Sequence, residues 1–226
     1  MKQTERSLKN EIIRIGRKLY SRSLVVAKSG NLSCRLDKDT ILITASGTSL
    51  GELRQKDIVK VNLSNKIEGK TRTLQICDRK RESGSLILSS RQPSSELSLH
   101  SMIYRNFECT RVIHCHPPLT NAYFAVYSSL AELIFETRYT IGEVPVVKQN
   151  TVTVTNPEPV ISALKKNRIV VLKNHGVVAI ADDFSEAFYC IEALESAVEV
   201  AAAARLFKKD ILDDLDTCLN IKLKKA

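Results

Sequence analysis

The apolar residues of this chain change their spacing several times, and that alternation constrains the fold more than any other feature. Helical spacing over 8–22 predicts an amphipathic helix, and further helices are expected at 95–106, from 117, at 156–167 and at 185–207. Short β-branched runs predict strands at 31–36, 40–44, 58–63, 111–115, 144–147, 152–155, 169–172 and 177–180. No strict strand–helix–strand repeat and no longer repeat is present, so we expect an α+β domain or an irregular αβα sandwich.

The length limits how these elements can be divided. A chain of 226 residues is one large domain or two small ones, and it can bury about 70–75% of its unfolded surface without disulfides or a structural metal. The segment 71–92 is polar and basic, and we expect it to be a surface insertion. Residues 208–226 are expected to form a charged tail.

Composition indicates the cellular compartment and the classes of binding partner. The six cysteines form no C-x-x-C pair, which is typical of reduced thiols in the cytoplasm. No apolar stretch reaches the ~18 residues of a membrane span, and the polar N-terminus predicts neither a signal peptide nor an anchor. The net charge of +9 suggests nucleic acid, but only 5% of the residues are aromatic and none is tryptophan. We therefore expect no membrane or nucleic-acid partner.

Three of the four histidines occupy positions suited to metal binding. His114 and His116 end a predicted strand, where alternate residues face the same side, so both rings can reach one ion. A catalytic zinc site usually needs a third protein ligand, and His175, beside Gly176 at another strand end, is the candidate. The alternative is that the pair forms ordinary hydrogen bonds at a strand end.

A helix start provides the candidate proton-transfer group. Ser94, Ser95 and Glu96 stand at the start of the helix expected at 95–106, where capping and first-turn acidic residues are common. Alternatively, the hydroxyl and N–H groups hold a phosphate while Glu96 acts as a base. His100, four residues later on the same helical face, is interpreted as a buried, hydrogen-bonded histidine.

Five short motifs, taken in order, resemble the class II aldolase and adducin family, with the fuculose-phosphate aldolases as the nearest pattern. The resemblance covers about residues 8–207, and the order and separations of the motifs make it specific. The motifs are Gly30-Asn31-Leu32-Ser33, Thr44-Ala45-Ser46-Gly47, Pro93-Ser94-Ser95-Glu96, His114-Cys115-His116 and Asn174-His175-Gly176.

The resemblance implies a single domain over 1–226, an αβα sandwich with a mainly antiparallel central sheet. It implies an aldehyde-lyase that uses Zn²⁺ to cleave a ketose 1-phosphate, similar to L-fuculose 1-phosphate, through a metal-stabilised enediolate. The products are dihydroxyacetone phosphate and an aldehyde, and family members are commonly homotetramers. The family's zinc ligands match His114, His116 and His175, and its acid/base matches Glu96. Its phosphate-binding residues match Gly30, Asn31, Ser46, Gly47, Ser94 and Ser95.

The sequence also departs from the family pattern. Family aldolases use tyrosines as proton donors, one of them from the C-terminal tail of a neighbouring subunit. Here no tyrosine follows Tyr189, and only Tyr139 lies near the other expected position. The sequence therefore does not identify the aldehyde half of the substrate.

Related activities are the alternatives. A decarboxylase, epimerase or dehydratase of the same superfamily would use similar metal-assisted chemistry on a sugar phosphate. Glu96 favours an aldolase over the epimerases, which place aspartate there, whereas decarboxylases can keep glutamate. A non-catalytic scaffold similar to the adducin head is a further alternative, and the intact histidines argue against it.

Overall fold

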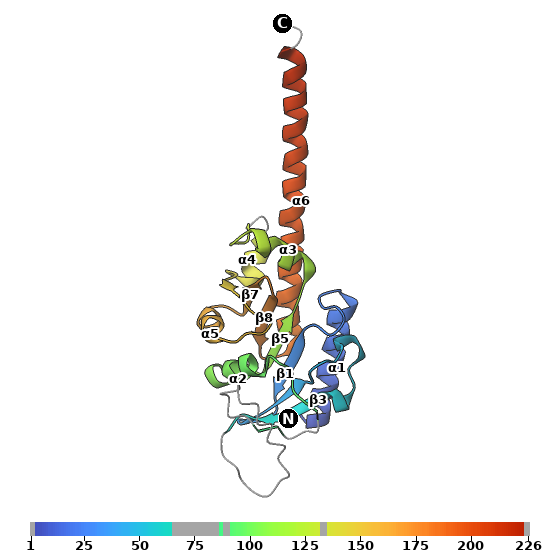
Figure 1. Cartoon of the computed structure of the whole chain (residues 1–226), viewed down its shortest axis with the longest axis vertical. Helices are drawn as coiled ribbons and strands as arrows, with labels where there is room; N and C mark the ends of the chain where they lie inside the picture. The colour runs from blue at the N-terminus through green and yellow to red at the C-terminus, as the bar shows by residue number, and fades with distance from the viewer. Residues whose placement is uncertain (1–2, 65–85, 88–90, 132–134, 224–226) are drawn as a thin grey trace, which may run out of the picture.

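An eight-stranded sheet forms the middle layer of the protein in the computed structural model (Figure 1). The structure describes residues 3–64, 86–87, 91–131 and 135–223, with no side chains described at 86–87 or beyond 207. All neighbouring strands are antiparallel except β6 and β7. The order is β4 (Leu86–Ile87), β3 (Ile58–Asn62), β2 (Thr40–Thr44), β1 (Asn31–Arg35), β5 (Arg111–Cys115), β8 (Gly176–Ala181), β7 (Ile169–Lys173) and β6 (Val146–Lys148).

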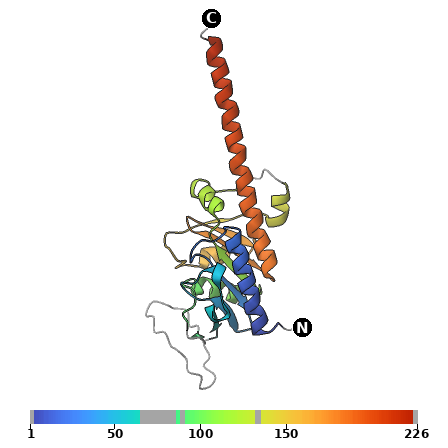
Figure 2. The ribbon, with the colours of Figure 1, turned by 90° about the vertical axis from the view of Figure 1, so that its right-hand side faces the viewer.

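Helices cover both faces of this sheet, which makes the fold an αβα sandwich. Helix α1 (Glu5–Ser21) and the first part of α6 (Phe184–Leu223) lie side by side on one face (Figure 2). Helices α2 (Leu97–Asn106) and α5 (Glu158–Leu164) cover the other face. The mainly antiparallel αβα sandwich expected from the sequence is therefore confirmed.

Strand residues alternate between two hydrophobic cores. On β2, Leu42 packs towards α1 and α6, whereas Ile41 and Ile43 pack towards α2 and α5. A strand covered on both faces is apolar along its whole length, which explains the unbroken runs in the sequence.

Four shorter elements pack against the helices of the first face. Two 3₁₀ turns, η1 (Leu50–Glu52) and η2 (Gln55–Asp57), follow β2 and pack beside α1. Helices α3 (Pro118–Val126) and α4 (Phe135–Ile141) lie against α6. Helix α4 was not expected from the sequence.

Three expectations differ from the structure. No strand forms over 152–155, because the chain bends there and exposes Val152, so the alternating valines have no partner strand. Helix α6 does not stop at Phe207 but continues to Leu223, since no glycine or proline interrupts it, and it projects well beyond the sheet (Figure 1). Most of the insertion at 71–92 lies outside the described residues, but β4 within it pairs with β3 at the sheet edge.

Over the part of the chain that the structure describes, no helix is both long enough and apolar enough to span a membrane.

Candidate active site

The antiparallel pairing of β5 with β8 brings the histidine motifs together. His114 lies opposite Val178 in this pairing, and its Nδ1–H donates to the Val177 carbonyl oxygen at 2.9 Å. That hydrogen bond places the ring proton on Nδ1, so Nε2 of His114 carries a lone pair. The Nε2 atom of His116 lies 3.0 Å from it.

The turn between β7 and β8 places His175 beside this pair. Asn174 adopts a left-handed conformation at φ +62°, which an asparagine tolerates better than most residues. A side chain at position 176 would put its Cβ 2.4 Å from the Cys115 carbonyl oxygen and 2.6 Å from the His116 ring, so only glycine fits. The His175 ring centroid lies 4.8 Å from that of His114 and 5.2 Å from that of His116.

The three imidazoles suit a metal ion. Their nearest ligand atoms all lie within 4.8 Å of one another. The 3.0 Å separation of two of them is close to the ~3.3 Å between neighbouring nitrogens around a tetrahedral zinc with Zn–N bonds of ~2.0–2.1 Å. The buried Nδ1 of His175 has no hydrogen-bond partner among the described residues.

Burial keeps these rings neutral, which is the form that binds metal. It lowers the pKa of His116 to about 4, with a further contribution from neighbouring His175. It also lowers the pKa of His114 and His175. No proton therefore competes for the ring nitrogens at neutral pH.

Glu96 lies at the N-terminus of α2, next to the histidines. The residue is only 3% exposed, and Oε1 lies 3.9 Å from Nε2 of His175. The Val154 N–H donates to both carboxylate oxygens, at 3.2 and 3.1 Å. Burial raises the pKa of Glu96 and the Val154 N–H partly offsets this, so the group is suited to exchanging protons nearer neutrality.

Hydrogen bonds join two further segments that line the site. Ser94 N–H donates to the Thr44 carbonyl at 3.0 Å, and Ser46 N–H donates to the Gln92 carbonyl at 2.9 Å. Gly47 has φ +72° and nothing within 4 Å of its missing Cβ, so its backbone faces open space. A bound anion can therefore approach this turn closely.

One cavity of about 240 Å³ collects these groups. All ten site residues proposed from the sequence line it: Gly30, Asn31, Ser46, Gly47, Ser94, Ser95, Glu96, His114, His116 and His175. The other lining residues are Lys28, Ser29, Ala45, Thr48, Val152 and Thr153. No tyrosine of the described chain lines the cavity, and Tyr139 is 94% exposed.

Lys28 is the residue that the sequence reasoning missed. It is the only lysine or arginine among the described residues that line the cavity. The turn that carries it is held by Ser29, whose Oγ accepts from Val26 N–H at 3.0 Å and donates to the Val26 carbonyl at 2.7 Å. The sequence signal that could have identified Lys28 is its position two residues before the Gly30-Asn31 motif.

His100 is a buried, hydrogen-bonded histidine, as expected from the sequence. Its Nδ1 lies 2.5 Å from Ser33 Oγ and its Nε2 lies 2.6 Å from Asn31 Oδ1. Burial lowers its pKa to about 3.

The low pKa of His100 predicts acid sensitivity. An unfolded chain takes up a proton on this ring below about pH 6.5 and the folded one does not, so stability falls as the pH decreases towards about 3. Between pH 7.5 and 5, His100 should account for about 2 kcal/mol of lost unfolding free energy. Denaturant unfolding of the metal-free protein should show a pH slope that is shallower in His100→Gln; identical slopes would contradict this.

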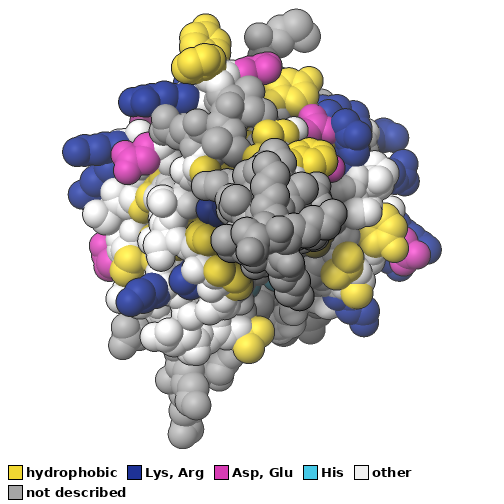
Figure 3. All heavy atoms as spheres, turned by 90° about the horizontal axis from the view of Figure 1, so that it is seen from above, with side chains coloured by type: hydrophobic (Ala, Val, Ile, Leu, Met, Phe, Trp, Pro, Cys, Tyr) yellow, Lys and Arg dark blue, Asp and Glu magenta, His cyan; other side chains and the backbone are white. Residues whose placement is uncertain are grey.

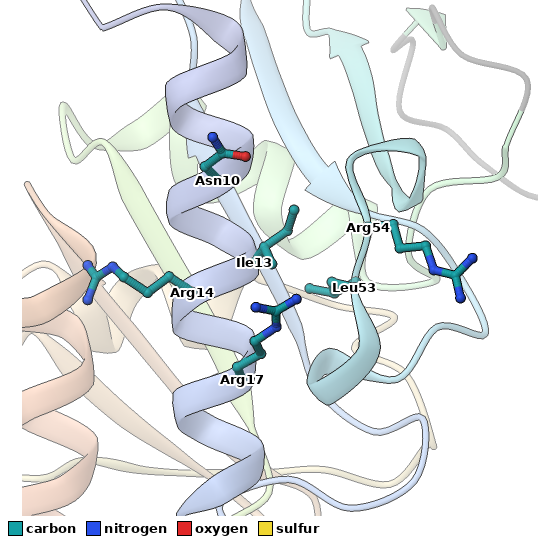
Figure 4. A pocket seen from close by; sticks show the side chains of 6 residues that line it. All are labelled: Asn10, Ile13, Arg14, Arg17, Leu53 and Arg54. Atoms are coloured by element: carbon teal, nitrogen blue, oxygen red, sulfur yellow. The ribbon is translucent and has the colours of Figure 1, made fainter.

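A separate hollow of about 530 Å³ lies between α1 and residues 53–54 (Figure 4). Arg14, Arg17 and Arg54 line it, but the side chains of Arg14 and Arg54 point away from each other. Arg14 and Arg54 therefore do not converge on one ligand, and these arginines add to the positive field of the surface.

Comparison with known proteins agrees with this arrangement. A model of the "Class II Aldolase and Adducin N-terminal domain" family matches residues 10–202. The "L-fuculose phosphate aldolase" of Methanocaldococcus jannaschii is 29% identical over 206 residues, which cover 89% of this chain and 99% of that protein. A "3-oxo-tetronate 4-phosphate decarboxylase" of Pectobacterium atrosepticum is 27% identical over 208 residues, covering 87% of this chain and 84% of that protein.

A solved structure has the same fold. The L-fuculose-1-phosphate aldolase from Thermus thermophilus superposes with a TM-score of 0.72 at 26% sequence identity. The match covers 89% of this chain and 96% of that one.

Proposed function

The chain belongs to the class II aldolase and adducin family, and we propose that it is a zinc-dependent aldolase that reversibly cleaves a ketose 1-phosphate. The products are dihydroxyacetone phosphate and an aldehyde. Family membership by itself supports a lyase-type enzyme. The observation that carries the finer proposal is that three neutral histidines and the buried Glu96 share one cavity with turns suited to phosphate.

The metal would be held by His114, His116 and His175. A bound zinc ion would supply Lewis acidity, which offsets the negative charge that develops on the substrate oxygens. The hydrogen bond from His114 Nδ1–H to the Val177 carbonyl fixes the ring so that Nε2 faces the cavity.

Glu96 would move the proton. In the direction of carbon–carbon bond formation it removes a proton from the carbon next to the carbonyl of dihydroxyacetone phosphate, and in cleavage it returns that proton. Its raised pKa makes both steps accessible near neutral pH, and the Val154 N–H holds the carboxylate in place.

The phosphate would lie against the turns and strand end that carry the neutral donors of the cavity. Gly30, Asn31, Ser46, Gly47, Ser94 and Ser95 would supply hydroxyl, amide and backbone donors, which position the substrate rather than take part in bond breaking. These groups are all neutral. Lys28 would therefore contribute the positive charge on this side of the cavity.

Replacing Lys28 should weaken substrate binding. We expect Lys28→Met to raise KM about tenfold with little change in kcat, because one partly exposed charge–phosphate contact is lost. Lys28→Arg should restore most of the affinity. Lys38→Met, at an exposed lysine that does not line the cavity, is the matched control; an unchanged KM in Lys28→Met would exclude this role.

A substrate comparison tests the aldolase assignment. Zinc-loaded protein is incubated with L-fuculose 1-phosphate, and dihydroxyacetone phosphate is measured with a coupled reductase. In parallel, 3-oxo-tetronate 4-phosphate is supplied and carbon dioxide is measured, because a curated relative is named for that decarboxylation. Dihydroxyacetone phosphate without carbon dioxide supports the aldolase, and the reverse result makes the decarboxylase the function.

We propose further that the protein acts as a single-domain subunit of a cytoplasmic homotetramer. No described tyrosine lines the cavity, so a partner subunit is a natural source of the missing proton donor. The end of the molecule where α6 leaves the body carries exposed apolar side chains (Figure 3). Phe135 on α4 and Phe207 on α6, 99% and 68% exposed, support association there.

A further inference from the structure

A chain of buried polar side chains runs behind the cavity wall. The Tyr104 hydroxyl lies 2.9 Å from Ser33 Oγ, Ser33 Oγ lies 2.5 Å from His100 Nδ1, and His100 Nε2 lies 2.6 Å from Asn31 Oδ1. All four residues are buried, and only Asn31 lines the cavity. We call Tyr104, Ser33 and His100 the relay.

With Oδ1 of Asn31 facing His100, the direction of each hydrogen bond in the relay can be assigned. Asn31 Oδ1 can only accept, so Nε2 of His100 carries the proton. A neutral imidazole has a single N–H, so Nδ1 accepts from the Ser33 hydroxyl. Ser33 Oγ then accepts from the Tyr104 hydroxyl, which stays protonated because burial raises its pKa.

The Asn31 amide is oriented with its Oδ1 towards His100. Its oxygen is held by His100, so its Nδ2 group is on the other side of the amide. Within the described residues, Nδ2 has no hydrogen-bond partner. The amide would otherwise be free to rotate by 180° and present its oxygen, which repels an anion.

The relay also connects the two halves of the site. Asn31 and Ser33 lie two residues apart on β1 and so face the same side of the sheet. His100 and Tyr104 lie on α2, the helix whose N-terminus carries Glu96. The bond between His100 and Asn31 therefore ties the helix of the proton-transfer group to the strand of the phosphate-binding wall.

We propose that His100, oriented by Ser33 and Tyr104, is a positioning residue that fixes the Asn31 amide with its N–H groups towards the bound phosphate. The inference rests on the proposed function in one respect, namely that the cavity holds a phosphate group. Asn31 touches the ligand, whereas His100 acts only through Asn31. The relay thus makes the cavity selective for an anion at this position.

A double-mutant cycle on phosphate binding tests the proposal. Inorganic phosphate is titrated into zinc-loaded protein by calorimetry, in the wild type, His100→Phe, Asn31→Ala and the double variant. Loss of one hydrogen bond to a charged ligand should weaken binding about 10- to 100-fold in either single variant. Because His100 acts through Asn31, His100→Phe should have no further effect in the Asn31→Ala background.

Further variants separate positioning from general damage to the fold. His100→Gln can still donate to Asn31 and accept from Ser33, so it should recover most of the affinity. If His100→Phe does not fold, Ser33→Ala replaces it in the same cycle, with an expected loss of about threefold that again disappears in the Asn31→Ala background.

Two results would exclude the positioning role of His100. Additive losses in the double variant, or a His100→Phe protein that binds phosphate like the wild type, would overturn the proposal. The cycle reads phosphate binding and not turnover. A protein that fails as an aldolase but shows the non-additive cycle would keep the relay and reject only the reaction assigned above.

Discussion

Glu96→Gln is expected to lower the rate of proton exchange on dihydroxyacetone phosphate by about a thousandfold, the middle of the range for loss of a general base. The glutamine amide keeps the size of the side chain but cannot take up the proton. The Val154 N–H can still donate to the amide oxygen, so the local backbone should be retained. Zinc content and phosphate affinity should stay within about twofold of the wild type.

The pH profile provides a second readout for the same variant. The wild-type rate should fall on the acid side as Glu96 becomes protonated, at a higher pH than an ordinary glutamate because burial raises its pKa. The residual activity of Glu96→Gln should lack this acid limb. Glu158→Gln, at an exposed glutamate in the first turn of α5, is the matched control and should behave like the wild type. A Glu96→Gln rate within about tenfold of wild type would remove the acid/base role.

His114→Ala is expected to abolish both metal binding and activity. His114 is the most buried of the three histidines, and its ring is fixed by the Val177 carbonyl, so its loss leaves only two ligands. Bound zinc, measured by mass spectrometry, should fall from about one ion per chain to near zero. The value of kcat/KM should fall by at least about four orders of magnitude, because the substrate loses its Lewis acid.

Cys115→Ala is the control for this change. Cys115 lies between the two histidines in sequence but packs into the core on the opposite face of β5. The Cys115→Ala protein should therefore still bind zinc. Zinc-loaded wild type should also unfold at a higher temperature than the chelator-treated protein, since the ion binds only the folded triad. Full zinc occupancy in His114→Ala would show that the triad is not the metal site.

The histidine site was only partly predictable from the sequence. Strand alternation placed His114 and His116 on one face, because that needs only local geometry. The approach of His175 depends on the pairing of β5 with β8, which joins segments far apart in the chain and has no local signal. The contact of His100 with Asn31 could not be predicted either, because it also joins segments far apart in the chain. His100 was nevertheless correctly interpreted as buried.

Two incorrect predictions also have identifiable physical causes. The alternating threonines and valines at 151–155 have a strand pattern, but Val154 uses its N–H for Glu96 instead of a neighbouring strand. The charged composition beyond Phe207 suggested a tail, although charged residues without glycine or proline extend a helix equally well. Each sequence pattern was compatible with two structures. A long-range contact decided the structure at 151–155, and the continuity of the helix decided it beyond Phe207.

Deuterium exchange on dihydroxyacetone phosphate shows directly whether the triad and Glu96 abstract a proton. Zinc-loaded protein is incubated with dihydroxyacetone phosphate in deuterated water, without any aldehyde, and the hydroxymethyl protons are followed by NMR. If the triad and Glu96 form a working site, one of the two protons should exchange stereospecifically, and the exchange should stop in chelator-treated protein and in His114→Ala. Wild-type protein with a full complement of zinc and no exchange would contradict the account.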